Sequence, residues 1–139
     1  MPYGWKEPPA LPSRTQLKDA AIALANAKLL TVSFENILGS IKSNDFIYLD
    51  PPYPPLNGTS YFTHYTKERF GEEDQKRLAS FVYKLDEIGA KFMMSNADIS
   101  LIRSLYSKFN LIDISVTRWI TCKAKKHRVS ELVITNYTR

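Results

Sequence analysis

Hydrophobic residues recur along the chain with two alternating periods. Residues 14–28 and 72–88 place apolar side chains three or four positions apart, which predicts two amphipathic helices, the second closed by Gly89. Residues 46–50 are a nearly continuous apolar run, typical of a strand buried on both faces of a sheet, and residues 91–96 predict another strand. This alternation of helix and strand predicts an α/β domain.

The remaining apolar runs extend the pattern. Residues 29–34 predict another strand, and residues 98–109 predict another helix. Residues 111–117 and 131–137 predict two consecutive strands joined by a basic connection without a helix, which favours an antiparallel pair. The sequence therefore predicts a mostly parallel sheet ending in an antiparallel strand pair, with helices on both faces.

The composition indicates the size of the domain, its net charge and the cellular compartment in which we expect it. The 139 residues, 44% of them hydrophobic, are enough for one domain with its own core. A net charge of +5 permits binding to phosphates without requiring it. A single cysteine, Cys122, allows neither an internal disulfide nor a cysteine metal cluster, and we expect no metal. Without an apolar run of about 20 residues we also expect no membrane span and a cytoplasmic location.

The most unusual stretch is D-P-P-Y, which follows the apolar run at residues 46–49. In an open α/β sheet, ligands bind at the carboxyl ends of the strands. Asp50 supplies a carboxylate that only accepts hydrogen bonds, and Pro51 and Pro52 supply carbonyls without competing N–H groups. Two convergent acceptors suit the exocyclic amine of adenine, and Tyr53 offers a ring on which an extruded base can stack.

Two other interpretations of this stretch remain open from the residues alone. The motif can be a stiff surface turn, with Asp50 as a cap. Alternatively, P-P-Y-P-P (residues 51–55) can be a polyproline II ligand for a partner domain, which requires it to be exposed.

Four stretches in this order decide between these interpretations: LDPPY, YFTHYTKERFGEEDQKRLA, FMMSNAD and ELVITNY. Together they resemble the Dam-like (D12 class) DNA adenine N6-methyltransferases over nearly the whole chain. The resemblance implies a partial Rossmann-like methyltransferase fold, S-adenosylmethionine as methyl donor, and double-stranded DNA from which an adenine is flipped. It also implies a role in restriction-modification.

The resemblance assigns roles to residues of this chain. Asp50 lies near the methyl donor as well as the adenine, and Ser33 and Phe34 border the adenosyl moiety, although a strand end and a core phenylalanine explain them equally well. Asn96 either steadies the site or caps a turn or helix. The adenine clamp consists of Asp50, Pro51, Pro52 and Tyr53.

Two further segments are implied to contact DNA or the flipped base. Pro54 to Ser60 resembles the loop that closes over the base, and Phe62 and Tyr65 either line its pocket or anchor packing. The connection from Thr117 to Arg128 can pair with phosphates, or can be a solvated hairpin tip. Its candidate DNA-binding residues are Arg118, Lys123, Lys125, Lys126 and Arg128.

Parts of the family pattern are missing. The five glycines are isolated, and the glycine-rich loop that approaches the cofactor does not occur. We therefore expect residues 1–14 to end a target-recognition or connecting segment and residues 15–139 to form the C-terminal half of a catalytic domain. Such a half would be inactive alone and would need an N-terminal complementing chain or self-association. The alternative is a non-catalytic DNA-binding or subunit-interaction remnant.

Overall fold

The computed structural model describes residues 11–54, 70–118 and 127–138, and the chain divides into two units, Met1–Val32 and Ser33–Arg139. The first unit contains helix α1 (Arg14–Leu24). Ser13 caps its start: the Ser13 Oγ accepts from the Gln16 backbone N–H at 3.2 Å, and the Gln16 side chain accepts from the Ser13 N–H at 2.8 Å. The predicted helix is confirmed, but it ends four residues earlier than expected.

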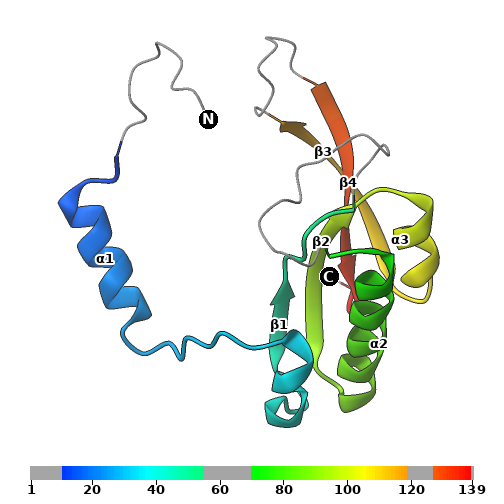
Figure 1. The fold of residues 1–139 in the computed structure, drawn as a ribbon, viewed down its shortest axis with the longest axis horizontal. Helices are drawn as coiled ribbons and strands as arrows, with labels where there is room; N and C mark the ends of the chain where they lie inside the picture. The colour runs from blue at the N-terminus through cyan, green and yellow to red at the C-terminus, as the bar shows by residue number, and fades with distance from the viewer. Residues whose placement is uncertain (1–10, 55–69, 119–126, 139) are drawn as a thin grey trace. The chain divides into compact units, whose positions relative to one another are not determined.

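The second unit is built on a four-stranded sheet in the order β1-β2-β4-β3 (Figure 1). Its strands are β1 (Phe46–Leu49), β2 (Lys91–Ala97), β3 (Asn110–Arg118) and β4 (His127–Thr135). The predicted antiparallel pair is confirmed as β3 and β4. The mostly parallel sheet is not confirmed, because among the described strands only β1 and β2 pair in parallel. The reason is that β4 returns between β2 and β3 and so makes both of its pairings antiparallel.

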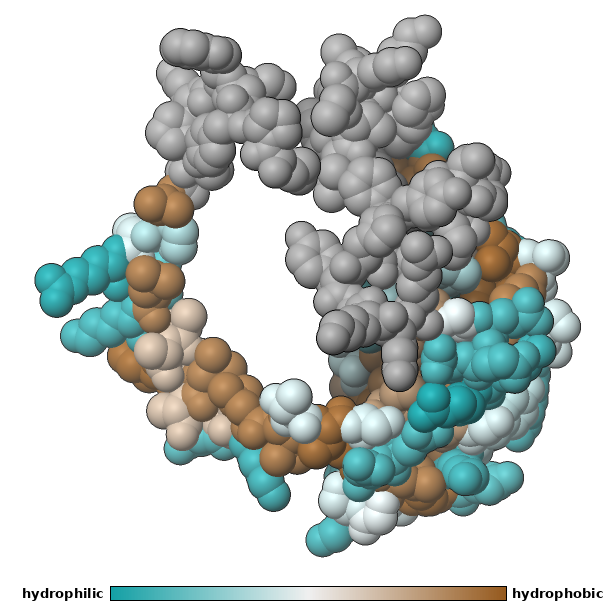
Figure 2. All heavy atoms as spheres, viewed as in Figure 1, coloured by the Kyte–Doolittle hydropathy of each residue, from teal (hydrophilic) through white to brown (hydrophobic). Residues whose placement is uncertain are grey.

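Three helical segments accompany the sheet: the 3₁₀-helix η1 (Phe34–Ser40), α2 (Glu72–Ile88) and α3 (Ser100–Leu105). Helix α2 has the predicted bounds, and Gly89 ends it in the left-handed conformation at φ 83°. Figure 2 shows hydrophilic side chains over α2. Its apolar stripe packs against every second residue of the strands. This core includes Leu78, Val82, Leu85, Phe92, Met94, Leu132 and Ile134.

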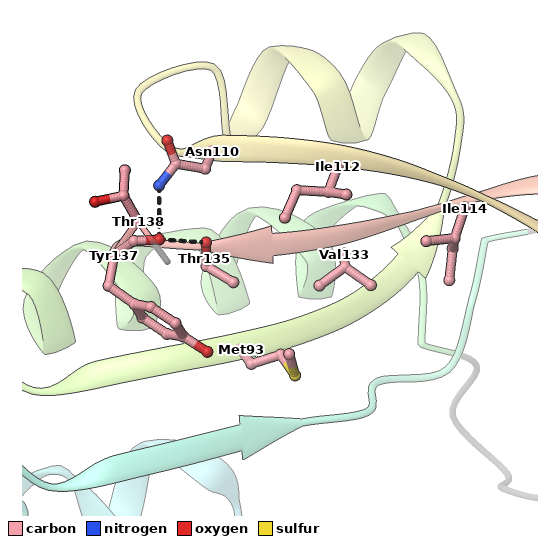
Figure 3. A pocket seen from close by; sticks show the side chains of 8 residues that line it. All are labelled: Met93, Asn110, Ile112, Ile114, Val133, Thr135, Tyr137 and Thr138. Atoms are coloured by element: carbon pink, nitrogen blue, oxygen red, sulfur yellow. Dashed lines mark hydrogen bonds between the residues drawn. The ribbon is translucent and has the colours of Figure 1, made fainter.

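The other face of the sheet carries no helix within the described part of Ser33–Arg139. Phe46 and Tyr48 of β1 are 57% and 60% exposed. Farther along the same face, apolar side chains of β2, β3 and β4 line a cavity of about 310 Å³ (Figure 3). The prediction of helices on both faces is therefore not confirmed for this unit, and β1 is not buried on both faces, because only its Ile47 and Leu49 face the core.

The strand expected at residues 29–34 was wrong. Residues 29–33 form no regular element, no described strand pairs with them, and Leu29 is 76% exposed. Phe34 instead begins η1, where it joins the margin of the core. No helix in the described ranges is both long and apolar enough to cross a membrane.

Candidate active site

Asp50 directly follows β1, where the parallel register brings it beside β2. Leu49 pairs with Met94, so the next residues on the two strands are Asp50 and Ser95. The Ser95 hydroxyl donates a 2.7 Å hydrogen bond to Oδ1 of Asp50. Asp50 remains exposed, so its carboxylate is both oriented and accessible.

The residues after Asp50 are anchored to two other elements. The Gln75 side-chain amide of α2 donates to the Pro52 carbonyl at 3.0 Å. The Tyr53 hydroxyl donates to Oε2 of Glu131 on β4 at 3.3 Å. Burial raises the pKa of the Tyr53 phenol, a hydrogen bond with Ser95 opposes this rise, and the nearby carboxylates of Glu131 and Asp50 add to it, so the hydroxyl keeps its proton at neutral pH. The segment from Asp50 to Tyr53 is therefore held in place by hydrogen bonds from α2, β2 and β4.

These contacts bear on the two alternative interpretations of the motif. Among residues 51–54 only Pro52 is exposed, and Pro51, Tyr53 and Pro54 are partly buried, whereas a polyproline ligand has to be exposed. Pro55 lies outside the described residues. Nor is the described stretch a free surface turn, because its contacts reach 23 to 78 positions away in sequence.

A cavity of about 210 Å³ opens beside the motif. Phe34 reaches it from η1, and its ring also packs edge-on against Phe81 with centroids 5.4 Å apart. Phe34 is therefore a packing residue that also lines this cavity, and its contact with a methyl donor stays a prediction. Ser33 does not line this cavity; it is exposed, and its hydroxyl donates to Glu35 at 3.2 Å. The full lining is Phe34, Tyr48, Leu49, Asp50, Pro51, Pro52, Phe70 and Leu78.

Asn96 lies within β2 and is fully buried, so it caps neither a turn nor a helix. Its side-chain amide donates to Oε1 of Gln75 at 3.2 Å, which links it to the Pro52 carbonyl. Gln75 was not among the predicted site residues. Its signal was available: it stands three positions before Leu78 and seven before Val82, which puts an amide on the apolar stripe of α2.

The structure describes only part of the predicted DNA-binding segment. Arg128 is exposed on β4 and pairs with Thr117 of β3 in the register, and Arg118 pairs with His127. Within the described ranges no three His, Cys, Asp or Glu side chains are grouped to hold a metal ion. Outside the described residues lie Phe62, Tyr65, Lys123, Lys125, Lys126 and residues 55–60 of the predicted loop.

Comparison with known sequences bears on this arrangement. Residues 2–120 match the family of D12 class N6 adenine-specific DNA methyltransferases. The chain belongs to this family. The D-P-P-Y stretch and the elements α2 and β2 that hold it fall inside the matched residues, whereas β4 lies outside them.

Individual relatives agree with the family assignment. The chain is 41% identical to the type II methyltransferase M.MjaIII of Methanocaldococcus jannaschii, over 99% of this chain and 48% of that protein. It is 36% identical to the type II methyltransferase M1.LlaDCHI of Lactococcus lactis, over 99% and 49%. It is 33% identical to the retron Ec67 DNA adenine methylase of Escherichia coli, over 96% and 45%. The chain thus spans about half the length of the curated relatives it matches.

Proposed function

We propose that this chain is the part of a DNA adenine N6-methyltransferase that holds the target adenine. The observation that carries the proposal is that the segment of residues 50–53 is anchored by three hydrogen bonds. Ser95 bonds to the Asp50 carboxylate, Gln75 to the Pro52 carbonyl, and Glu131 to the Tyr53 hydroxyl. A site fixed in this way before its substrate arrives loses little entropy on binding, which is what positioning catalysis requires. The family membership supports adenine as the base and N6 as the atom.

The acceptors available in this site match an amine with two N–H groups. Ser95 occupies Oδ1 of Asp50, which leaves Oδ2 to accept one N–H. None of the described residues donates to the Pro51 carbonyl, which can accept the other. Accepting both hydrogens draws N6 toward tetrahedral geometry and frees its lone pair. The carboxylate then stabilises the positive charge that develops on nitrogen, and such fixed charges are a large part of catalysis.

S-Adenosylmethionine is the methyl donor in this proposal. When bound, it supplies a methyl group: the bond from carbon to N6 forms as the bond to sulfur breaks, S-adenosylhomocysteine leaves, and N6 loses one proton. Phe34 and Asp50 would contact it, since both line the cavity beside the motif. At about 210 Å³ this cavity is smaller than the roughly 300–1,000 Å³ of sites that enclose drug-sized ligands. It fits one portion of the donor and leaves the rest to other residues.

The DNA substrate approaches this site as a flipped base. Tyr53 is partly buried and tied at its hydroxyl, so its ring is held in place for stacking, a contact worth about 1–3 kcal/mol per base. Flipping is needed because N6 cannot be reached inside the duplex. The basic connection between β3 and β4, including Arg118 and Arg128, would bind backbone phosphates.

We further propose that the chain needs a complement, either a second polypeptide or self-association. The open face of the sheet supports this, because Phe46 and Tyr48 are more than half exposed there. Unpaired strand edges and apolar faces commonly mark association surfaces. Methyl transfer by the isolated chain is expected to be undetectable.

A chimera tests the proposal. This chain would replace the matched part of M.MjaIII, and transfer of tritiated methyl groups from S-adenosylmethionine to duplex DNA would be measured. We expect transfer to adenine N6, and a fall of about 10²–10³-fold in kcat for Asp50→Ala, as for the loss of other charge-stabilising groups. An inactive chimera beside active M.MjaIII would overturn the proposal. DNA binding that persists in an inactive chimera would favour the non-catalytic remnant instead.

A further inference from the structure

Two buried amides lie directly beneath the proposed adenine clamp. Gln75 and Asn96 both have 0% exposed surface, although side chains of this type are usually found at the protein surface. They come from different elements, the first turn of α2 and the end of β2. Burying two amides in a core is unfavourable unless their hydrogen bonds are made. The groups to which Gln75 and Asn96 bond therefore indicate the role of the two side chains.

The hydrogen bonds of this pair run in one direction. The Ala97 backbone N–H donates to Oδ1 of Asn96 at 2.8 Å. Asn96 Nδ2 then donates to Oε1 of Gln75 at 3.2 Å, and Gln75 Nε2 donates to the Pro52 carbonyl at 3.0 Å. Because an N–H can only donate and a carbonyl can only accept, the two ends of this relay fix both amide orientations without ambiguity.

The relay ends at the Pro52 carbonyl, whose direction determines that of the Pro51 carbonyl. The ring of Pro52 locks its φ angle, so the ψ angle of Pro52 is the only free torsion between the Pro51 and Pro52 carbonyls. A donor that holds the Pro52 carbonyl therefore also sets the direction of the Pro51 carbonyl relative to it. The same bond keeps the Pro52 carbonyl turned toward α2.

We infer that Gln75, oriented by Asn96, is a positioning residue for methyl transfer. It holds the Pro52 carbonyl so that the Pro51 carbonyl, together with Asp50, faces the amine of the adenine. This inference rests on the proposed function, because it concerns the geometry of that same clamp. Gln75 itself touches neither the adenine nor the methyl donor.

Three variants separate positioning from folding. Gln75→Met keeps the side-chain length but removes the donor, so the Pro52 carbonyl loses its partner. Gln75→Glu can still donate to that carbonyl when its carboxyl group is protonated, and cannot when it is ionised. Asn136→Ala is the matched control. The Asn136 amide makes three hydrogen bonds, to Phe92, Asp86 and Ala90. These bonds lie at the start of β2, far from the clamp.

The measurements are steady-state kinetics in the M.MjaIII chimera and carbon-13 NMR on the intact chain. We expect Gln75→Met to lower kcat by about 10²-fold, the typical cost of a small misplacement of reacting groups, with little change in KM for DNA. Gln75→Glu should approach the wild-type kcat at low pH and lose it as pH rises, measured relative to wild type at each pH. Asn136→Ala should lower the midpoint of thermal unfolding and leave kcat unchanged.

The NMR signal of the Pro52 carbonyl carbon, read through the Tyr53 amide, reports the hydrogen bond without activity. It should shift in Gln75→Met and stay in place in Asn136→Ala. A Gln75→Met chimera with wild-type kcat would overturn the inference and leave the proposed function standing. An inactive wild-type chimera would instead overturn the proposed function and the inference with it.

Discussion

The Ser95 hydroxyl donates a 2.7 Å hydrogen bond to Oδ1 of Asp50 from the neighbouring parallel strand. This contact occupies Oδ1 and fixes the plane of the carboxylate group, and with it the position of Oδ2. In the proposed mechanism, Oδ2 is then the oxygen that accepts an N–H of the adenine amine. In this mechanism Ser95 would influence the reaction without touching the reacting atoms.

Ser95→Ala should therefore slow methyl transfer without unfolding the protein. A hydrogen bond to a charged group contributes about 1.5–3 kcal/mol, and each 1.4 kcal/mol corresponds to about tenfold in rate. We expect kcat of the M.MjaIII chimera to fall by about 10- to 100-fold. Ser80→Ala is the control, because among the described residues the Ser80 hydroxyl donates to just the Lys76 carbonyl, on the exposed side of α2. Equal kcat values for the two variants would contradict the role given to Ser95.

Tyr53 can be separated into its ring and its hydroxyl. Tyr53→Phe removes the contacts of the hydroxyl with Glu131 and Ser95 but keeps the stacking surface, whereas Tyr53→Ala removes both the hydroxyl and the ring. Because base stacking on an aromatic ring is worth about 1–3 kcal/mol, binding of the flipped base should be clearly weaker in the alanine variant. Fluorescence of 2-aminopurine at the target position of a DNA duplex would measure this. If phenylalanine and alanine impaired flipping equally, stacking would not be the function of this ring.

Much of the fold was predictable because its signals are local. The spacing of apolar residues gave α2 its bounds, and Gly89 marked its end because a left-handed C-cap favours glycine. The apolar strand followed by Asp50 placed the candidate site at a strand end, and Ser95 lies beside it for the same reason, at the corresponding position of the next parallel strand.

The rest depends on contacts between distant residues. An apolar run such as residues 46–49 shows that a strand forms, but not whether an element covers its second face. The run at residues 29–34 has strand composition without a strand to pair with in the described structure. The sequence shows Gln75 as an amide on an apolar stripe but does not show its partners, because Pro52 lies 23 positions earlier and Asn96 lies 21 positions later.

Arg128 provides a test of the proposed phosphate contacts. Its side chain is exposed on β4, and neutralising one phosphate releases about one counterion. In the intact chain, Arg128→Ala should weaken binding to duplex DNA at every sequence and reduce the slope of log K against log salt by about 1. Lys91→Ala is the control, since Lys91 is exposed at the start of β2 and carries the same charge. An unchanged slope in Arg128→Ala would remove this residue from the DNA contact.

Tyr106 is a buried tyrosine whose hydroxyl has no hydrogen-bond partner within the described parts of the chain. An unsatisfied buried hydroxyl costs about 1–3 kcal/mol, so Tyr106→Phe should raise the free energy of unfolding by about 1 kcal/mol at pH 7. Tyr83→Phe is the matched control: the Tyr83 hydroxyl donates to the Leu105 carbonyl at 3.3 Å, so its removal should destabilise the fold.

The advantage of Tyr106→Phe should grow in alkali. Burial raises the pKa of the Tyr106 phenol above its ordinary value of 10.0. The unfolded chain therefore loses this proton before the folded chain does, so stability is full below pH 10 and falls as pH rises toward the folded pKa. Phenylalanine has no proton to lose, and urea unfolding at pH 7 and pH 11 should show a larger gain for Tyr106→Phe at the higher pH. A variant less stable than wild type at pH 7 would mean that the hydroxyl is satisfied after all.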